Sequence, residues 1–261
     1  AAVAWSGEQM TDATPALSVR GLSKSFGALQ VAQSIDLDLQ PGARLGLIGP
    51  NGAGKTSFVN LLTGMLTADA GTIVLNGEDI TRLPPERRVR RGLVRTHQIN
   101  TLLMESSLRE NIAIAVAERE NFAWRFLRFT PQWRRCLDEA GAQLAAFGIA
   151  DLAERTVAEL PYGQQRLLEI AIALVLKPRV LLLDEPAAGV PAAEAHAIHD
   201  VIDKLPADIA ILMIEHDMDL VFRFAREIAV LVQGHVLTTG TPREIAADPR
   251  VRSVYLGRSA A

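Results

Sequence analysis

A glycine-rich stretch carries the first chemistry that the sequence suggests. Its residues fit the pattern G-x-x-x-x-G-K-[ST] followed by a serine, and they are Gly49, Pro50, Asn51, Gly52, Ala53, Gly54, Lys55, Thr56 and Ser57. Glycines in such a loop let successive backbone N–H groups turn inward around a phosphate, and the helix that follows adds its positive N-terminal end. Lys55 places a cation beside the outer phosphates, and the hydroxyl of Thr56 suits Mg²⁺. The pattern predicts a nucleoside triphosphate site, the alternative being an ordinary glycine-rich turn before a helix.

Two adjacent carboxylates follow an apolar stretch later in the chain. Residues 180–186 read VLLLDEP, so a buried strand delivers Asp184 and Glu185 to its C-terminal end, where ligands gather in open α/β sheets. Phosphoryl transfer needs positioning and electrostatics more than covalent help. We therefore predict that Asp184 binds the metal, directly or through water, and that Glu185 orients and polarises the attacking water. Alone, such a pair would more often cap the next helix; downstream of the glycine-rich loop, catalysis is the better interpretation.

Two single polar residues stand where short apolar segments end. Gln98 follows residues 93–96, and His216 follows residues 209–215. A lone glutamine at such a place is usually solvated or caps a helix, and a lone histidine is more often structural than catalytic. Spacing alone therefore leaves both roles open.

The elements that must position these residues alternate between strand and helix. Apolar residues 35, 37 and 39 alternate with polar ones up to Pro41-Gly42, which is typical of a half-buried strand. Further strands are expected at 44–48, 180–184, 209–215 and 227–233, a helix at 55–65, and a hairpin at the Asn76-Gly77 pair. Such alternation predicts an α/β protein with a parallel sheet and helices on both faces.

The middle of the chain lacks strand patterns. Helical patterns take over from residue 98 to residue 159, and Ser107 with Glu110 is typical of a capping box that opens a helix through Ala117. We expect one domain over residues 16–257 with an inserted helical subdomain over 98–176. Loose tails are expected at 1–15 and 258–261.

Size and composition exclude several classes of protein. The chain has 261 residues, 49% of them apolar, a net charge of −3 and one cysteine, Cys136. These values suit a globular protein in a reducing compartment, exclude an internal disulfide, and give no reason to expect binding to nucleic acid. The apolar stretch at 170–176 is far shorter than the ~20 residues that span a bilayer. Because the opening residues also lack the features of a secretory signal, we expect a cytoplasmic protein.

Together these segments resemble the ATP-binding cassette family, the ATPase subunits of ABC transporters. They occur in the family's order, from the glycine-rich loop through Gln98, LPYGQ at 160–164, the Asp-Glu strand and the loop at 188–191 to His216. The resemblance implies a P-loop NTPase core with a mainly parallel sheet, an N-terminal antiparallel β-subdomain and an inserted α-helical subdomain. It also implies hydrolysis of ATP with Mg²⁺.

The family motifs give roles to single residues. Phe26 in LSKSFG matches the aromatic residue that stacks on adenine, and Gln98 matches the residue that senses Mg²⁺ and the transport partner. His216 matches the γ-phosphate switch, which makes it a catalytic candidate beside Glu185 and Lys55. The resemblance implies a metal site made by Thr56, Gln98 and Asp184.

In the family, two cassettes close face to face, and each ATP lies between the glycine-rich loop of one chain and the signature of the other. LPYGQ matches this signature, usually written LSGGQ, so Tyr162, Gly163 and Gln164 are expected to contact the partner's nucleotide. Pro161 replaces the serine and supplies neither a hydroxyl nor an N–H, although proline suits the first turn of a helix. The lost hydrogen bond is worth on the order of 1.5–3 kcal/mol.

Pro191 is a second departure, since the family usually has Asp or Asn there. We expect an active ATPase with a weakened signature.

A narrower resemblance is to the larger ATPase of branched-chain amino-acid importers. It rests on RTHQINTLL, LPYGQQRLLEIA, LLLDEPAAG, IEHDMDLVF, GTPREI and DPRVRSVYLG. It implies a second ABC ATPase as partner (a different chain, or alternatively a second copy), two transmembrane permease subunits and indirectly a periplasmic solute-binding protein. The resemblance also implies that the chain is attached to the cytoplasmic side of the inner membrane. Alternatives are an importer ATPase for urea, amides or aromatic acids, a soluble ABC ATPase without a transport role, and a nucleotide-binding module without turnover.

Residues 119–135 hold a local concentration of aromatic and basic side chains. Five of the chain's 13 aromatic residues lie here, together with five arginines. One interpretation is a surface that touches a membrane partner or anionic headgroups. The favoured interpretation is an amphipathic helix that packs its aromatic face into the subdomain core, with Pro131 interrupting the helix.

Overall fold

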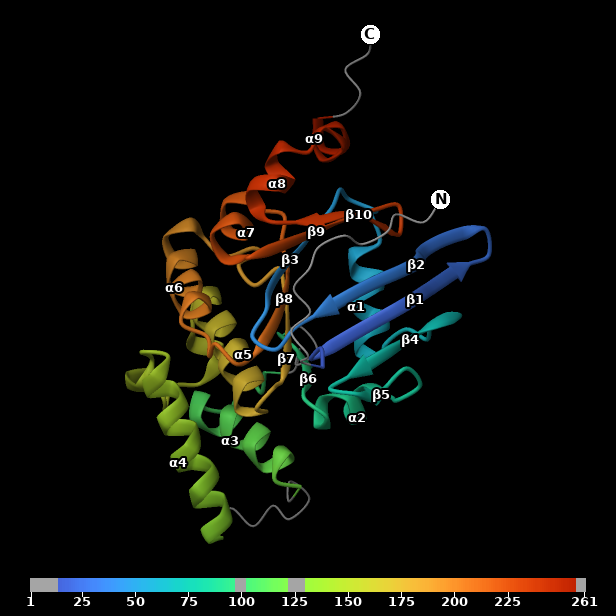
Figure 1. Cartoon of the computed structure of the whole chain (residues 1–261). Coiled ribbons are helices and arrows are strands. Elements are labelled where there is room, and N and C mark those ends of the chain that lie inside the picture. Colours follow the sequence, from blue (N-terminus) through green and yellow to red (C-terminus); the bar gives the residue numbers. More distant parts are fainter. Residues whose placement is uncertain (1–13, 97–101, 122–129, 257–261) are drawn as a thin grey trace.

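Two sheets form the frame of the chain (Figure 1). The computed structural model describes residues 14–96, 102–121 and 130–256. The first sheet has four antiparallel strands in the order β2-β1-β4-β5, and the second has six strands in the order β10-β9-β3-β8-β7-β6. Neighbours in the second sheet run parallel, except for β9 and β10. This is the expected α/β fold with a mainly parallel sheet and an N-terminal antiparallel one.

Alternating side chains build the antiparallel sheet. Its strands are β1 (Leu17–Phe26), β2 (Leu29–Leu39), β4 (Ala70–Leu75) and β5 (Glu78–Asp79). In β2, residues 35, 37 and 39 are buried while residues 36 and 38 are exposed, as the alternation predicts. Asn76 (φ 48°) and Gly77 (φ 83°) both take the left-handed conformation that a tight two-residue hairpin requires, so the predicted hairpin is confirmed.

The parallel sheet lies between two cores. Its strands are β3 (Arg44–Ile48), β6 (Leu93–Arg95), β7 (Val180–Asp184), β8 (Ala210–Ile214), β9 (Glu227–Val232) and β10 (His235–Gly240). Val180 and Leu182 face a core shared with α1 and the antiparallel sheet, and Leu181 and Leu183 face the core formed with helices. Burial on both faces explains why the central strands β7 and β8 are continuous apolar stretches.

The remaining helices connect these strands or follow the last of them. They are α1 (Lys55–Thr63), α2 (Pro85–Arg90), α6 (Ala192–Asp203), α7 (Met218–Phe224), α8 (Pro242–Ala247) and α9 (Pro249–Leu256). Gly64 (φ 81°) ends α1 two residues before the predicted boundary, because its left-handed backbone closes the helix. In the described part of the chain, no helix is long and apolar enough to span a bilayer.

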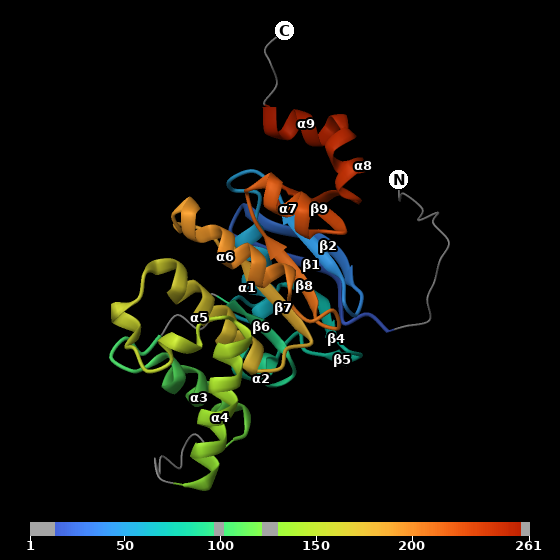
Figure 2. The same cartoon turned by 90° about the vertical axis from the view of Figure 1, so that its left-hand side faces the viewer.

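A helical block is inserted between β6 and β7, and Figures 1 and 2 show it at the end of the molecule opposite α8 and α9. It contains α3 (Leu108–Arg119), α4 (Pro131–Ala146), two short 3₁₀ turns (Ala150–Leu152 and Val157–Glu159) and α5 (Tyr162–Val175). Ser107 and Glu110 form the predicted capping box at the start of α3, with N···O distances of 3.1 and 3.2 Å.

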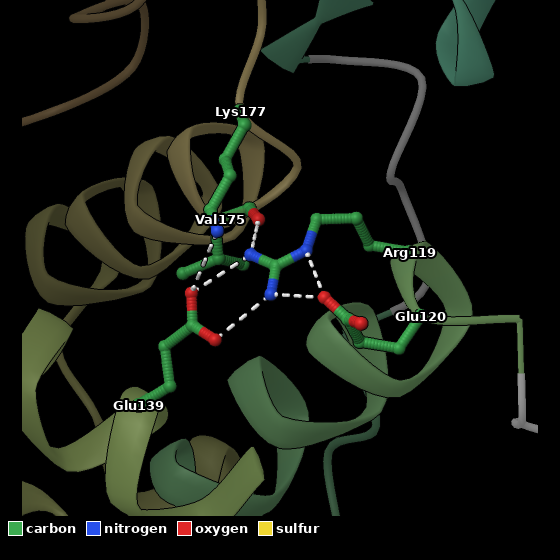
Figure 3. Close-up of polar contacts among 5 residues, drawn as sticks. All are labelled: Arg119, Glu120, Glu139, Val175 and Lys177. Atoms are coloured by element: carbon green, nitrogen blue, oxygen red, sulfur yellow. Dashed lines mark hydrogen bonds and ion pairs between the residues drawn. The ribbon is translucent and has the colours of Figure 1, made fainter. Parts of the chain in front are cut away.

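Arg119 ties the three long helices of this block together (Figure 3). From the end of α3, its guanidinium makes two hydrogen bonds of 2.7 and 2.8 Å to the Glu139 carboxylate on α4. It also donates to the carbonyl oxygen of Val175 at the end of α5, at 2.6 Å. A charged fork that bonds a carboxylate at two points fixes both distance and direction, so this contact sets how the helices lie together.

Pro131 is the first residue of α4, so no helix runs across it, as expected. α3 ends at Arg119, Asn121 has a left-handed backbone (φ 57°), and Thr130 caps α4 with its hydroxyl. Proline at the first helical position gives up an N–H that would have no helical partner anyway. Of the five aromatic residues in this segment, Phe122, Trp124, Phe126 and Phe129 lie outside the described residues. Trp133 is partly buried and packs against the core, which agrees with the packing interpretation.

Candidate functional site

The glycine-rich loop leads from β3 into α1 and needs glycine for two reasons. Gly52 (φ 77°) and Gly54 (φ 101°) hold left-handed backbones that other residues rarely adopt. A Cβ added at Gly54 would also lie 2.5 Å from the carbonyl oxygen of Val31. The loop is held from behind as well, since the N–H of Gly234 donates to the carbonyl oxygen of Ala53 at 2.8 Å. The backbone is therefore shaped before any ligand arrives.

Lys55 lies folded back onto this loop. Its ammonium group donates to the carbonyl oxygens of Gly49 at 2.6 Å and Pro50 at 3.2 Å. Burial lowers the pKa of Lys55, while the carboxylates of Glu185 and Asp184 act in the opposite direction. The lysine and both carboxylates thus belong to one electrostatic unit, although they are about 130 residues apart in the sequence.

Asp184 ends β7 and is already paired. Its Oδ2 accepts a short hydrogen bond from Arg95 at the end of the neighbouring strand β6, and both side chains are largely buried. Arg95 also donates to Oδ1 of Asn60 on α1 at 2.8 Å, which connects the Asp-Glu strand to the helix after the glycine-rich loop. The sequence analysis missed Arg95. A charged residue at the end of a short apolar strand, three residues before Gln98, was the available indication.

Glu185 has an unusual backbone. Its φ is 46°, in the left-handed region that glutamate rarely adopts. Its N–H donates to the carbonyl oxygen of Ile214 on β8 at 2.9 Å, and this contact helps to hold the conformation. Strained residues of this kind cluster at functional sites, where the surrounding structure fixes them. The side chain of Glu185 is half-exposed at the end of β7.

His216 lies beside Glu185. It follows β8, and its Nδ1 is 3.8 Å from Oε1 of Glu185 and 3.8 Å from Oε2 of Glu215. The imidazole is 69% exposed, so it can reach a ligand bound across the strand ends. The structure therefore brings together Lys55, Asp184, Glu185 and His216. Gln98 lies outside the described residues.

A bound Mg²⁺ is compatible with the residues present. Thr56 is exposed at the start of α1 and Asp184 ends β7, which together offer a hydroxyl and a carboxylate. Mg²⁺ prefers oxygen ligands and usually keeps several waters, with only one or two protein ligands beside substrate phosphates. In the described part of the chain, Arg95 donates to Oδ2 of Asp184 and no hydrogen bond reaches Oδ1, which is left for a metal or its water.

Phe26 stands apart from these residues, at the end of β1. Its ring is 53% exposed, which is a large exposure for phenylalanine, and the Lys24 ammonium lies 5.5 Å from the ring centroid. An exposed ring beside a cation offers a stacking surface for a planar ligand.

The signature residues begin α5. Pro161 is the residue immediately before the helix, so it precedes rather than opens the first turn, and Tyr162, Gly163 and Gln164 form that turn. The guanidinium of Arg166 lies 5.0 Å from the centroid of the Tyr162 ring. The N–H of Gln164 donates to the carbonyl oxygen of Pro161 at 3.0 Å, so the N–H groups of Tyr162 and Gly163 are the ones at this helix start that suit an anion.

One of these N–H groups already has an anionic partner within the chain. Gly163 donates to Oε2 of Glu194 on α6 at 3.0 Å. The contact is tight, since a Cβ added at Gly163 would lie 2.5 Å from that oxygen and 3.3 Å from the Val190 side chain. Sequence reasoning missed Glu194, because nothing in its neighbourhood marks it as a partner of a residue 31 positions earlier.

A helical block inserted after β6 of a P-loop core, with a helix start that can face a second nucleotide, defines the class of ATP-binding cassette ATPases. The family model described as "ABC transporter" matches residues 32–188, and a second, described as "Branched-chain amino acid ATP-binding cassette transporter", matches residues 235–261. The chain belongs to the ABC transporter family, and it is an ATP-binding, ATP-hydrolysing transporter subunit.

Several known proteins are similar over nearly the whole chain. The high-affinity branched-chain amino acid transport ATP-binding protein LivG of Escherichia coli K12 is 40% identical over 94% of this chain and 99% of its own length. BraF of Pseudomonas aeruginosa, described in the same words, is 38% identical over the same shares. The ADP conformation of MJ1267, an ATP-binding cassette of an ABC transporter, superposes with a TM-score of 0.81 at 28% identity, over 94% of this chain and 100% of that one.

Proposed function

We propose that this chain powers the uptake of branched-chain amino acids as an ATPase subunit of an ABC importer. The observation that carries the substrate class is the match of residues 235–261 to the branched-chain family model, a segment that lies beyond the general ABC match. The similarity to LivG and BraF, which are described as branched-chain amino acid transport proteins, supports the same substrate class.

In this proposal the ATP phosphates lie along the glycine-rich loop. Residues 49–57 bind the phosphates through backbone N–H groups, and Phe26 stacks on the adenine. Lys55 leaves the carbonyl oxygens that it now contacts and pairs with the β- and γ-phosphates. Thr56, Asp184 and Gln98 would hold Mg²⁺, which would neutralise charge that develops on the phosphates.

Hydrolysis depends on the residues that follow β7 and β8. Glu185 orients the attacking water and accepts hydrogen bonds from it, with its backbone fixed by the contact to Ile214. His216 contacts the γ-phosphate from the neighbouring strand end, 3.8 Å from Glu185. Both residues act by position and electrostatics, which is the main requirement of phosphoryl transfer.

The assembly follows from the position of the signature. Tyr162, Gly163 and Gln164 face the nucleotide of a second ABC ATPase, which we propose is a different chain. Two transmembrane permease subunits anchor the pair to the cytoplasmic side of the inner membrane, and a periplasmic solute-binding protein delivers the substrate. The absence of the serine at position 161 weakens the nucleotide site of the partner and leaves this chain's own site intact.

ATP-dependent association tests the ATPase part of the proposal. Mixed with the partner ATPase, Glu185→Gln should block hydrolysis at this chain's site and trap a closed heterodimer, measured by sedimentation with and without ATP. Lys55→Ala, which removes the phosphate cation, is the control and should remain monomeric. A Glu185→Gln protein that still hydrolyses ATP at the wild-type rate would contradict the assigned catalytic role.

Reconstitution tests the substrate. The complete transporter in proteoliposomes should take up labelled leucine, isoleucine and valine when ATP is enclosed, and Glu185→Gln should abolish this uptake. Transport of urea, a short amide or an aromatic acid in place of these amino acids would overturn the proposed substrate and leave the ATPase role standing.

A further inference from the structure

Glu215 is a buried carboxylate that no step of the proposed reaction uses. It is the residue between β8 and His216, and its side chain is only 3% exposed. Glutamate is almost never fully buried unless it is paired, because removing a carboxylate from water carries a large free-energy cost. Its position beside a catalytic candidate therefore calls for a functional reason.

The contacts of Glu215 reach two loops. Its Oε2 accepts a hydrogen bond from the backbone N–H of His216 at 3.1 Å and lies 3.8 Å from Nδ1 of the same histidine. The backbone amides of Asp217, in the loop after β8, and Ala187, in the loop after β7, also act on this carboxylate. Glu215 thus lies where the loop of Glu185 meets the loop of His216.

A reciprocal backbone contact completes this junction. The N–H of Glu185 donates to the carbonyl oxygen of Ile214, the residue before Glu215, at 2.9 Å. One loop therefore donates to the strand end through Glu185 and to the buried carboxylate through Ala187. The relative position of Glu185 and His216 depends on both contacts.

The second carboxylate oxygen of Glu215 is poorly satisfied. Among the described residues, Oε1 is buried and has no hydrogen-bond partner. A buried polar atom without a partner lowers stability, so a residue chosen for stability alone would be a poor fit here. Glutamine has nearly the same shape and would keep one hydrogen-bond acceptor at this position without placing a charge in the interior.

We propose that Glu215 is a positioning residue for ATP hydrolysis, which fixes the backbone and imidazole of His216 relative to Glu185. The inference rests on the roles proposed for Glu185 and His216. Nδ1 of the imidazole lies 3.8 Å from each of two carboxylates, the half-exposed Glu185 and the buried Glu215. Loss of the buried charge leaves the histidine paired with Glu185 alone and draws it away from the γ-phosphate.

The test compares Glu215→Gln with wild type in the ATPase assembly in which the full chain is active. We expect kcat to fall on the order of 10- to 100-fold, the loss typical of a small misplacement of a reacting group, with little change in KM for ATP. Glu227→Gln removes a carboxylate at the start of β9, outside the proposed site, and should leave both constants near wild type. An unchanged kcat in a folded Glu215→Gln protein would overturn the inference.

A double variant separates positioning from general structural damage. If Glu215 acts through His216, adding Glu215→Gln to His216→Ala should cause no further loss of kcat, whereas full additivity would overturn the inference. Glu215→Asp is the second variant if the glutamine fails to fold, and the shorter carboxylate should also lower kcat rather than KM. Glu185→Gln and His216→Ala test the proposed function separately. Wild-type ATPase activity in both variants would refute the catalytic roles proposed for these two residues.

Discussion

Arg95 and Asp184 form an ion pair at the ends of two neighbouring parallel strands, and their side chains are only 10% and 15% exposed. The pair places a fixed positive charge against the carboxylate that we expect to hold Mg²⁺. The same arginine is bonded to Asn60 on α1, so the contact also connects the Asp-Glu strand with the helix of the glycine-rich loop.

Removing Arg95 should strongly destabilise the fold. Arg95→Leu leaves the Asp184 carboxylate buried without its partner, and breaking a buried pair in this way costs about 3–5 kcal/mol. Urea unfolding measures the change. Arg20→Leu is the matched control, because the Arg20–Asp38 pair is exposed (52% and 38%), and the loss of an exposed pair costs at most about 1 kcal/mol. Equal effects of the two substitutions would contradict the assigned role of the buried pair.

Glu194 should oppose ATP-dependent association. Its carboxylate now occupies the N–H of Gly163, a group expected to meet the γ-phosphate of the partner's nucleotide. In a Glu185→Gln background, Glu194→Gln should strengthen the ATP-induced dimer several-fold, because a neutral amide competes less with a phosphate. Sedimentation over a range of ATP concentrations measures this shift. Asp200→Asn, an exposed change on the same helix, should have no effect, and weaker association of the Glu194 variant would refute the prediction.

The backbone of the glycine-rich loop should not tolerate a side chain at Gly54. Gly54→Ala combines a φ of 101° with a contact of 2.5 Å to the carbonyl oxygen of Val31. We expect a loss of at least ~1–3 kcal/mol in stability together with loss of ATP binding, since the strain acts on the loop itself. Gly148→Ala shares the left-handed backbone (φ 70°) in open space. Gly148→Ala therefore measures the stability cost of the left-handed backbone alone. If Gly54→Ala loses no more stability than Gly148→Ala, the added Cβ does not collide with Val31.

The pH dependence of stability should depend on Glu215. Burial raises the pKa of Glu215 above its ordinary value of 4.5, while nearby backbone amides and His216, the titratable group beside it, act in the opposite direction. A carboxyl whose pKa is raised by folding stabilises the fold below the unfolded pKa, and this contribution is lost as the pH rises through the folded pKa. The stability of Glu215→Gln relative to wild type should therefore increase from about pH 4.5 towards neutral pH. Urea unfolding midpoints of both proteins across this pH range measure the change. A difference in midpoint that does not vary with pH would refute the prediction.

Much of the frame could be predicted because it depends on local chemistry. The glycine-rich loop, the Ser107–Glu110 capping box and the Asn76-Gly77 turn each lie within a few residues, where backbone preferences are decisive. The apolar stretches of β7 and β8 predicted strands buried on both faces. The resemblance of the motifs to ABC ATPases gave the family, which the comparisons confirm. The expected interruption at Pro131 is confirmed, since Thr130 is extended and α4 begins at the proline.

The sequence by itself therefore determined the elements, the family and the residue types that we expect to meet the nucleotide. Only the tertiary structure decided which partners those residues have. Arg95 meets Asp184 across 89 positions and Glu194 meets Gly163 across 31, so neither pair leaves a local pattern in the chain. Glu215 looks like an ordinary polar residue beside His216 until the loops after β7 and β8 close over it. Packing brings strand ends together irrespective of their separation in sequence, and burial then turns these chance neighbours into strong electrostatic partners.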